Sequence, residues 1–152
     1  MKKIMWTFSI FLLAATLSCS KKSVDAPPPE EVGTKFPPPT WRADATGKYP
    51  ATMTAVVALP ATLVANGTDN DNLAAFADNE CRGEGVIVKV NGTNLFFVLI
   101  QGQANETSKI TFKYYSNKTS YMYESSSPLN FLVDAIYGSA ANPKTLEFTQ
   151  LR

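Results

Sequence analysis

The stretch that decides the fold is DNLAAFADNECRGEGVIVKV, residues 71–90. It contains two runs rich in apolar and β-branched residues, and Asp78-Asn79 separates them. Asp and Asn are frequent in turns because their side chains hydrogen-bond to nearby backbone and tolerate the left-handed region. The stretch therefore predicts two strands joined by a tight hairpin.

The second of these strands has an irregular pattern. Successive side chains of a strand point to opposite faces, so Cys81 points away from Arg82 in a strand that begins at Glu80. Cys81 is therefore expected to be buried. The valines of the GVIVKV run share their parity with Arg82, and a strand that changes faces needs a bulge. We expect the bulge at Gly83 or Gly85, because glycine takes unusual φ values at little steric cost.

The chain from about Trp41 onward shows the same type of pattern. Short apolar runs alternate with clusters of Asn, Gly, Asp, Ser and Pro. Asn91-Gly92 between two such runs predicts a hairpin with a type I′ turn. Leu95–Ile100 is apolar on both faces, which predicts a central covered strand, whereas the alternation in KITFKYY (109–115) predicts a half-exposed strand. These patterns predict an all-β fold, a single antiparallel β-sandwich of seven or eight strands, Ig-like or jelly-roll-like.

Composition limits both the size and the function of the protein. The chain has 152 residues, of which 45% are hydrophobic and 18% charged, and this suffices for one globular domain. A net charge of +1 without a basic stripe gives no reason to expect a nucleic-acid partner. The chain contains no histidine, which removes Ser-His-Asp catalysis, Cys-His catalysis and HExxH zinc chemistry. We therefore expect no catalysis and no cofactor apart from a candidate calcium site.

The N-terminus has the pattern of a targeting signal. Lys2 and Lys3 precede an apolar run over residues 4–17 that is too short for a permanent membrane span. Cys19 follows this run, and the segment resembles a bacterial lipoprotein signal with a lipobox. The resemblance implies that residues 1–18 are cleaved and that acyl chains on Cys19 attach the protein to the membrane. The alternative is an ordinary secretory signal in which Cys19 is incidental.

A proline-rich segment follows the cysteine. Residues 20–40 contain six of the ten prolines, including two triplets, and proline triplets favour extended polyproline II. We therefore divide the chain into a signal peptide (1–18), a lipidated cysteine with a Pro-rich linker (19–40) and a β-sandwich domain (41–152). The expected location is the cell envelope, as an outer-membrane lipoprotein. Both the inner and the outer leaflet of that membrane are alternatives for its anchor.

The domain itself resembles a known type of module. Ala75, Phe76 and the Glu-Cys-Arg-Gly run of residues 80–83 match the pattern A-F-x-x-x-E-C-R-G. This pattern resembles an uncharacterised β-sandwich module of secreted and surface proteins from Bacteroidetes-type bacteria, and the resemblance covers nearly all of residues 41–152. It implies a β-sandwich fold and an envelope location, but no activity.

The ECRGE run is the first candidate site. As a nucleophile, Cys81 has no histidine to act as a base, and burial keeps the pKa of a thiol high, so we interpret Cys81 as a core residue. Arg82 could grip an anionic or polar ligand through its guanidinium group. The structural alternative is an ion-pair ladder of Glu80, Arg82 and Glu84 on one face of the strand.

The GTDNDN segment, residues 67–72, is the second candidate site. Asp69 and Asp71 are oxygen ligands at alternate positions, as Ca²⁺ requires. The segment lacks the glycine and the distal glutamate of an EF-hand, so a polar turn is the alternative to a calcium site.

Aromatic residues form the third candidate site. Tyr115 and Tyr123 flank a turn near Asn117, and Trp41 begins the domain. Alternate tyrosines of a hairpin are expected to point outward, where rings stack on sugars or anchor protein interfaces.

Together these patterns predict a lipid-anchored envelope module that binds a glycan or an envelope protein without catalysis. The alternatives are a structural component of an envelope assembly and a small carboxylate-dependent glycosidase. An exposed aromatic cluster would favour a glycan, whereas a broad apolar patch would favour a protein partner. The ligand-binding candidates are Trp41, Arg82, Tyr115 and Tyr123.

Overall fold

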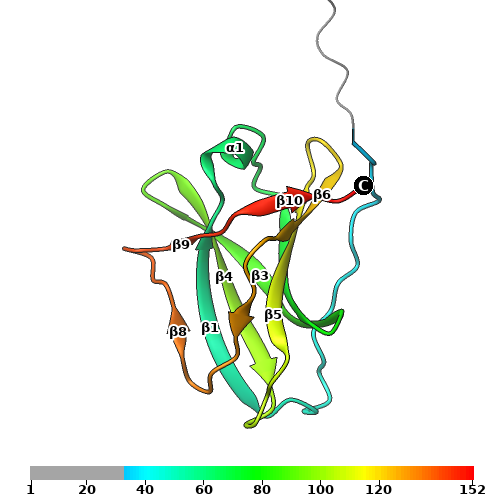
Figure 1. Cartoon of the computed structure of the whole chain (residues 1–152). Helices are drawn as coiled ribbons and strands as arrows, with labels where there is room; N and C mark the ends of the chain where they lie inside the picture. The colour runs from blue at the N-terminus through cyan, green and yellow to red at the C-terminus, as the bar shows by residue number, and fades with distance from the viewer. Residues whose placement is uncertain (1–32) are drawn as a thin grey trace, which may run out of the picture. The chain divides into compact units, whose positions relative to one another are not determined.

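A computed structural model describes residues 33–152, and these residues form one compact unit (Figure 1). The predicted signal peptide and the lipidation site Cys19 lie outside the described residues. Within residues 33–152, no helix is both long enough and apolar enough to cross a membrane.

The unit is built from strands, and the predicted all-β class is confirmed. A short helix, α1 (Ala61–Val64), follows the first strand. The strands are β1 (Ala51–Ala58), β2 (Asn72–Ala77), β3 (Glu80–Val90), β4 (Thr93–Gly102), β5 (Lys109–Ser116), β6 (Tyr121–Ser125), β7 (Leu129–Asn130), β8 (Ile136–Tyr137), β9 (Lys144–Thr145) and β10 (Phe148–Gln150).

The strands form one curled sheet in the order β10-β6-β5-β2-β3-β4-β1-β8, with β7 beside β5 and β9 beside β1 (Figure 1). The sheet is continuous because β3 pairs with β2 through its first half and with β4 through its second half. It is mixed and not purely antiparallel, because β8 and β9 both run parallel to β1. It has ten strands where seven or eight were expected. The division into the two layers of a sandwich stays a prediction.

Both predicted hairpin turns are confirmed. Asp78 and Asn79 have φ values of 49° and 65°, and they connect β2 to β3. Asn91 and Gly92 have φ values of 49° and 82°, and they connect β3 to β4. Positive φ at both central residues is the property of a type I′ turn, and it matches the twist of the flanking strands.

The predicted bulge in β3 is also present. Phe76 pairs with Cys81 and Ala75 pairs with Gly83, so Arg82 is the additional residue. The reason for the glycine differs from the one expected, because Gly83 does not have a positive φ. Instead, a Cβ at Gly83 would collide with the backbone carbonyl of Leu99. The glycine therefore allows β3 to pass close to β4 as it changes partners.

The bulge brings Cys81 and the following valines to one face of the sheet, but that face is the outside. Cys81 packs with Phe76 and Ala74 in a small outer cluster. Val86 and Val88 continue this face and are 65% and 41% exposed. These valines therefore do not point into the main core, because the inward positions belong to their neighbours such as Ile87.

The main core lies on the opposite, concave face of the sheet. Its fully buried members include Phe96 and Ile100 from β4 and Phe112 from β5. Tyr114 lies among them, with its ring centroid 6.1 Å from that of Phe96 and 5.8 Å from that of Tyr123. The other face of β4 is only partly covered, since Leu99 is 56% exposed, so the expectation of a strand covered on both sides is wrong.

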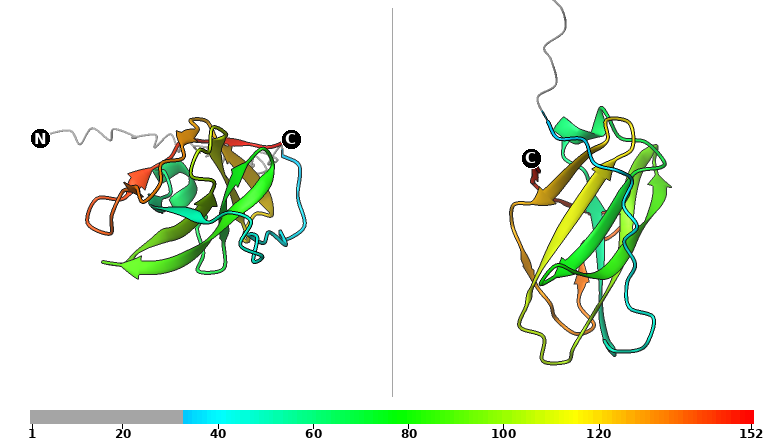
Figure 2. Two further views of the ribbon diagram at one scale, coloured as in Figure 1. Left: turned by 90° about the horizontal axis from the view of Figure 1, so that it is seen from below. Right: turned by 90° about the vertical axis from the view of Figure 1, so that its right-hand side faces the viewer.

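Residues 33–43, which we call the N-terminal strap, run along the outside of the sheet (Figure 2). The amide of Phe36 donates to the carbonyl of Ser120 at 2.8 Å, and the amide of Ala43 donates to Glu84 at 3.3 Å. The part of the predicted linker from residue 33 to residue 40 therefore lies against the domain.

Candidate functional site

Arg82, the bulged residue of β3, is buried. Its Nη1 lies 2.9 Å from Oε2 of Glu106, and the two side chains are only 6% and 8% exposed. The guanidinium carbon also lies 3.6 Å from the ring centroid of Tyr49, in cation–π geometry. Arg82 therefore ties β3 to the loop before β5, and it does not face solvent as a ligand-binding residue would.

The expected ion-pair ladder along β3 does not form. Glu80 pairs with Lys48 at 3.0 Å, and Glu84 pairs with Arg42 at 2.9 Å, both near the surface. The physical reason is the bulge, which takes Arg82 out of the alternation that would have aligned it with its acidic neighbours.

Glu106 is suited to hold the buried arginine. Burial alone would raise the pKa of this carboxyl, but the hydrogen bond from the Ser108 amide and the contact with Arg82 lower it below its ordinary value. Glu106 is therefore ionised at neutral pH. Nε of Arg82 is buried without a hydrogen-bond partner among the described residues.

Cys81 is buried, as predicted, and is 9% exposed. Burial raises the pKa of its thiol. A thiolate is the reactive form of cysteine, so this environment makes Cys81 a packing residue. Trp41 covers it from the strap, where its ring meets that of Phe76 edge to face at 5.4 Å.

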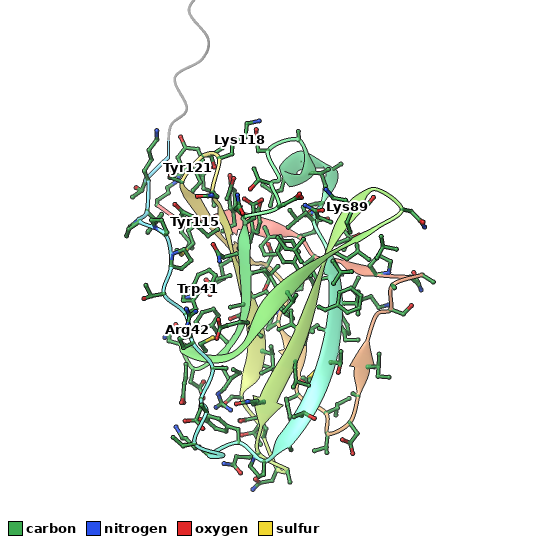
Figure 3. All side chains as sticks on the ribbon, turned by 180° about the vertical axis from the view of Figure 1, so that it is seen from behind. Trp41, Arg42, Lys89, Tyr115, Lys118 and Tyr121 are labelled. Carbon is green, nitrogen blue, oxygen red and sulfur yellow. The ribbon has the colours of Figure 1, made fainter. Side chains whose placement is uncertain are left out.

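The tyrosines expected to point outward do not do so. Tyr115 is 2% exposed, and its hydroxyl donates to the carbonyl of Phe36 in the strap. Tyr121 is buried, and Tyr123 is half-buried against the main core. Figure 3 shows Tyr115 and Tyr121 beside the strap. Both faces of this hairpin are covered, one by the core and the other by residues that the sequence placed in the linker.

A pocket of about 270 Å³ lies at the end of the domain, between the loop after α1 and the tip of the β3–β4 hairpin. Its polar lining includes Asp69, Lys89 and Asn94, and its apolar lining includes Leu59 and Phe96. Figure 3 shows Lys89 on the hairpin, next to the segment that carries α1. Two separate stretches of sequence, 59–71 and 89–96, therefore contribute to one concave surface.

Asp69 is at the centre of the polar side of this pocket. Asn94 Nδ2 donates to Asp69 Oδ1 at 2.8 Å, and Lys89 Nζ lies 3.2 Å from Oδ2. The Asn94 hydrogen bond, followed by the contact with Lys89, lowers the pKa of the Asp69 carboxyl. Asp69 and Lys89 are 66% and 57% exposed, so both retain access to solvent.

Asp71, which the calcium interpretation paired with Asp69, has a structural role. It is 5% exposed, and its two oxygens accept hydrogen bonds from the amide and hydroxyl of Thr68, from the Tyr114 hydroxyl at 2.6 Å and from the Asn117 amide at 2.9 Å. The lone pairs that a cation needs are therefore in use. No group of three metal-ligating carboxylate or cysteine side chains occurs within residues 33–152.

The outside of the sheet beyond the strap carries apolar side chains. We call this surface the open face, and it comprises the outward residues of β3, β4 and β8. In the register of the sheet, Val86 lies opposite Phe97 and Ile136 lies opposite Thr54. Its most exposed members are Val86 (65%), Leu99 (56%) and Ile136 (76%).

The open face borders a free strand edge. Residues 86–90 of β3 pair with β4 on one side, and no other described strand pairs with them. An unpaired edge presents backbone N–H and C=O groups that a further strand can bind. Sequence reasoning missed both the pocket and this edge, because each depends on which segments meet in space.

The fold and these surfaces define an all-β module with a polar pocket at one end and an apolar face beside a free edge. A scan of the chain against protein-family models found no match, and searches of curated proteins and of solved structures found none either. The similarity to secreted modules with the E-C-R-G pattern therefore stays a prediction from sequence.

Proposed function

We propose that this protein is a lipid-anchored, non-catalytic module of the cell envelope, and that it binds another envelope protein through the open face and the adjoining edge of β3. The observation that carries the proposal is the free edge at residues 86–90, which lies beside the exposed apolar residues Val86 and Leu99. Large exposed apolar patches commonly mark interaction sites.

A polypeptide is the class of ligand that fits both features. Its side chains can cover the apolar face, and its main chain can pair with the unpaired groups of β3, as in strand addition. A glycan offers neither a peptide ladder nor a broad apolar surface. None of the exposed large apolar side chains within residues 33–152 is aromatic. This surface therefore lacks the exposed aromatic rings on which sugars stack.

A second copy of this chain fits less well than a different protein. Two copies paired through their β3 edges would extend the sheet sideways, and Leu99 and Ile136 would stay uncovered. A partner that adds a strand and also packs over the face buries both sets of groups. We therefore assign the surface to a heterologous envelope protein with an exposed apolar strand, which includes the case of a structural assembly.

The proposal leaves out catalysis because the candidate chemical groups are engaged elsewhere. A glycosidase needs one carboxyl that holds a proton near neutral pH. The pKa of Asp69 is lowered, and both oxygens of Asp71 accept hydrogen bonds. Glu106 is paired with Arg82, and its pKa is lowered as well.

The anchor part of the proposal rests on Cys19 and can be tested separately. Metabolic labelling with a fatty-acid analogue should mark the wild-type chain and should not mark Cys19→Ala. The variant should also leave the membrane fraction. Undiminished labelling of Cys19→Ala would contradict lipidation at Cys19. It would not bear on the binding surface, which has its own test.

Site-specific photo-crosslinking in the full-length, membrane-bound protein tests the binding surface. A photoreactive residue at Leu99 should give a discrete adduct with one other envelope protein, and the same probe at Val133, which is 45% exposed in the loop before β8, should not. Amide hydrogen exchange in residues 86–90 should slow when the purified partner is added, because strand addition protects edge N–H groups.

Val88→Lys provides the matched test of strand addition, since an edge lysine opposes pairing. It should abolish both the adduct and the amide protection, whereas Val133→Lys should keep them. A homodimeric adduct, or a heteromeric adduct that survives Val88→Lys without amide protection, would overturn the proposed mode of binding.

A further inference from the structure

The pocket between the loop after α1 and the β3–β4 hairpin is independent of the open face, and its lining has a different chemistry. We propose that it binds one ring of a neutral, polyhydroxylated ligand, such as a single pyranose unit. The proposal is separate from protein binding, and of the pocket's lining residues only Lys89 also belongs to the free edge of β3.

The size of the pocket sets the size of the ligand. Its volume of about 270 Å³ is just below the range of roughly 300–1,000 Å³ found for sites that hold drug-sized molecules. A single sugar ring is a ligand of this scale. An extended oligosaccharide would need a longer groove, so further units would lie outside the pocket.

The charges of the pocket favour a neutral ligand. Asp69 and Lys89 face each other and cancel locally. The remaining carboxylate, Asp71, is buried and has its oxygens occupied. An anion would meet two carboxylates and a single lysine, and a metal ion would meet that lysine. These groups therefore do not favour the binding of an anion or of a metal ion.

The polar side has unused hydrogen-bonding capacity. An ionised carboxylate offers about four lone-pair sites, and Asp69 uses one oxygen for Asn94 and the other for Lys89. An ammonium group has three donors, and Lys89 uses one of them on Asp69. Adjacent acceptors and donors of this kind match neighbouring hydroxyl groups, each of which both donates and accepts.

Asn94 adds an independent sign of an absent partner. Its Oδ1 is buried and has no hydrogen-bond partner among the described residues. Buried polar groups in native proteins are nearly always paired, and an exception calls for a water or a ligand.

The apolar side completes the match to a sugar. Leu59, Val64 and Phe96 line the pocket together with the polar groups. A pyranose ring has C–H faces that pack on apolar side chains, while its hydroxyl rim seeks polar ones. Because the groups are close together, the pocket can satisfy both kinds of surface in one small ligand.

Titration followed by amide NMR tests the proposal with defined probes. The methyl glycosides of glucose, galactose, mannose and N-acetylglucosamine should be added separately to the lipid-free protein. At least one should give saturable shifts in the amides of residues 67–71 and 91–94, with a dissociation constant in the millimolar range. Glycerol at the same concentration should not reproduce them.

Three variants define the site. Asp69→Ala should weaken binding of the responding glycoside at least tenfold, because it removes the carboxylate and releases Lys89 and Asn94. Val64→Trp should block entry while leaving the polar groups intact, since Val64 is half-exposed at the pocket wall. Glu84→Gln, which alters an exposed ion pair elsewhere on β3, is the matched control and should bind like the wild type.

Two results would overturn the proposal. One is the absence of saturable shifts with all four glycosides at 50 mM. The other is a response that Asp69→Ala and Val64→Trp leave unchanged in correctly folded protein, as judged by their remaining amide signals. Neither result bears on binding at the open face, so this inference and the proposed protein interaction fail separately.

Discussion

Two regions of the outer face of the sheet differ in burial. Near the bulge, Cys81 and Phe76 lie on the outside of the sheet and are buried. Further along the same strand, Val86 also lies on the outside and is 65% exposed. The difference lies in the N-terminal strap, whose Arg42 and Ala43 bind Glu84 between the two regions.

The comparison shows that a sheet face becomes core or surface according to what covers it. Both regions carry apolar side chains, so hydrophobicity alone does not separate them. Trp41 supplies the missing layer over Cys81, and nothing in residues 33–152 supplies one over Leu99. The uncovered region is therefore the part of the sheet that is left for a partner, and substitutions should distinguish the two regions by their cost.

The largest effect is expected at the bulge, where β3 passes from one region to the other. Arg82→Ala leaves the carboxylate of Glu106 buried without its partner, which should cost about 3–5 kcal/mol in the free energy of unfolding. Urea denaturation measures this change. Arg42→Ala is the matched control, because it breaks an ion pair of the same 2.9 Å length at the surface and should change stability little.

The contribution of the same buried pair to the free energy of unfolding should depend on pH in the acid range. The pKa of Glu106 is lowered in the folded state, so its contribution is fully present above the ordinary glutamate pKa of about 4.3 and is lost as the pH falls through the folded value. Arg82→Ala should flatten this part of the pH–stability profile. Equal acid sensitivity in both proteins would show that Arg82 and Glu106 are not coupled in solution.

The next effect concerns the strap. Trp41→Ala removes the ring that packs on Phe76 and Cys81, and because Trp41 is only partly buried we expect a loss of about 3 kcal/mol, the low end for such truncations. Leu132→Ala, at a residue that is 62% exposed, is the control. A Trp41 variant as stable as the wild type would mean that the strap does not cover this face.

Cys81 lies under the same strap, and its substitution should change the free energy of unfolding less than that of Trp41. Its thiol should react slowly with thiol reagents in the native wild type, and much faster in Trp41→Ala or after unfolding, because burial raises its pKa and limits access. Cys81→Ser should lower stability by about 1–3 kcal/mol, because it buries a hydroxyl among apolar groups. Rapid native labelling would contradict its role as a packing residue.

The smallest effect is expected on the open face. Leu99→Thr introduces a β-branched residue, which strands favour, at a strand position that is 56% exposed, so the free energy of unfolding should change by no more than about 0.5 kcal/mol. Thermal and urea unfolding of the isolated protein check this. A loss comparable to that of Trp41→Ala would indicate that Leu99 is covered in the free protein, and the open face would then be unavailable to a partner.

The sequence by itself determined the local features of this fold. Asp78-Asn79 and Asn91-Gly92 specify tight turns because few other residues accept positive φ. The parity change in the GVIVKV run specified a bulge near Gly83, and the apolar position of Cys81 specified its burial. These features depend on residues close together in the chain, so they can be read without knowing what packs against them.

Only the tertiary structure decided which surfaces are covered and which residues meet. Alternation in a strand defines two faces but does not say which one receives a second layer. The strap covers Tyr115, although the sequence placed that ring in solvent and residues 33–40 of the strap in a linker. The pocket joins Asp69 to Asn94, which is 25 positions further along the chain. Such contacts depend on how the sheet curls and where distant segments return, and no short pattern of residues encodes that.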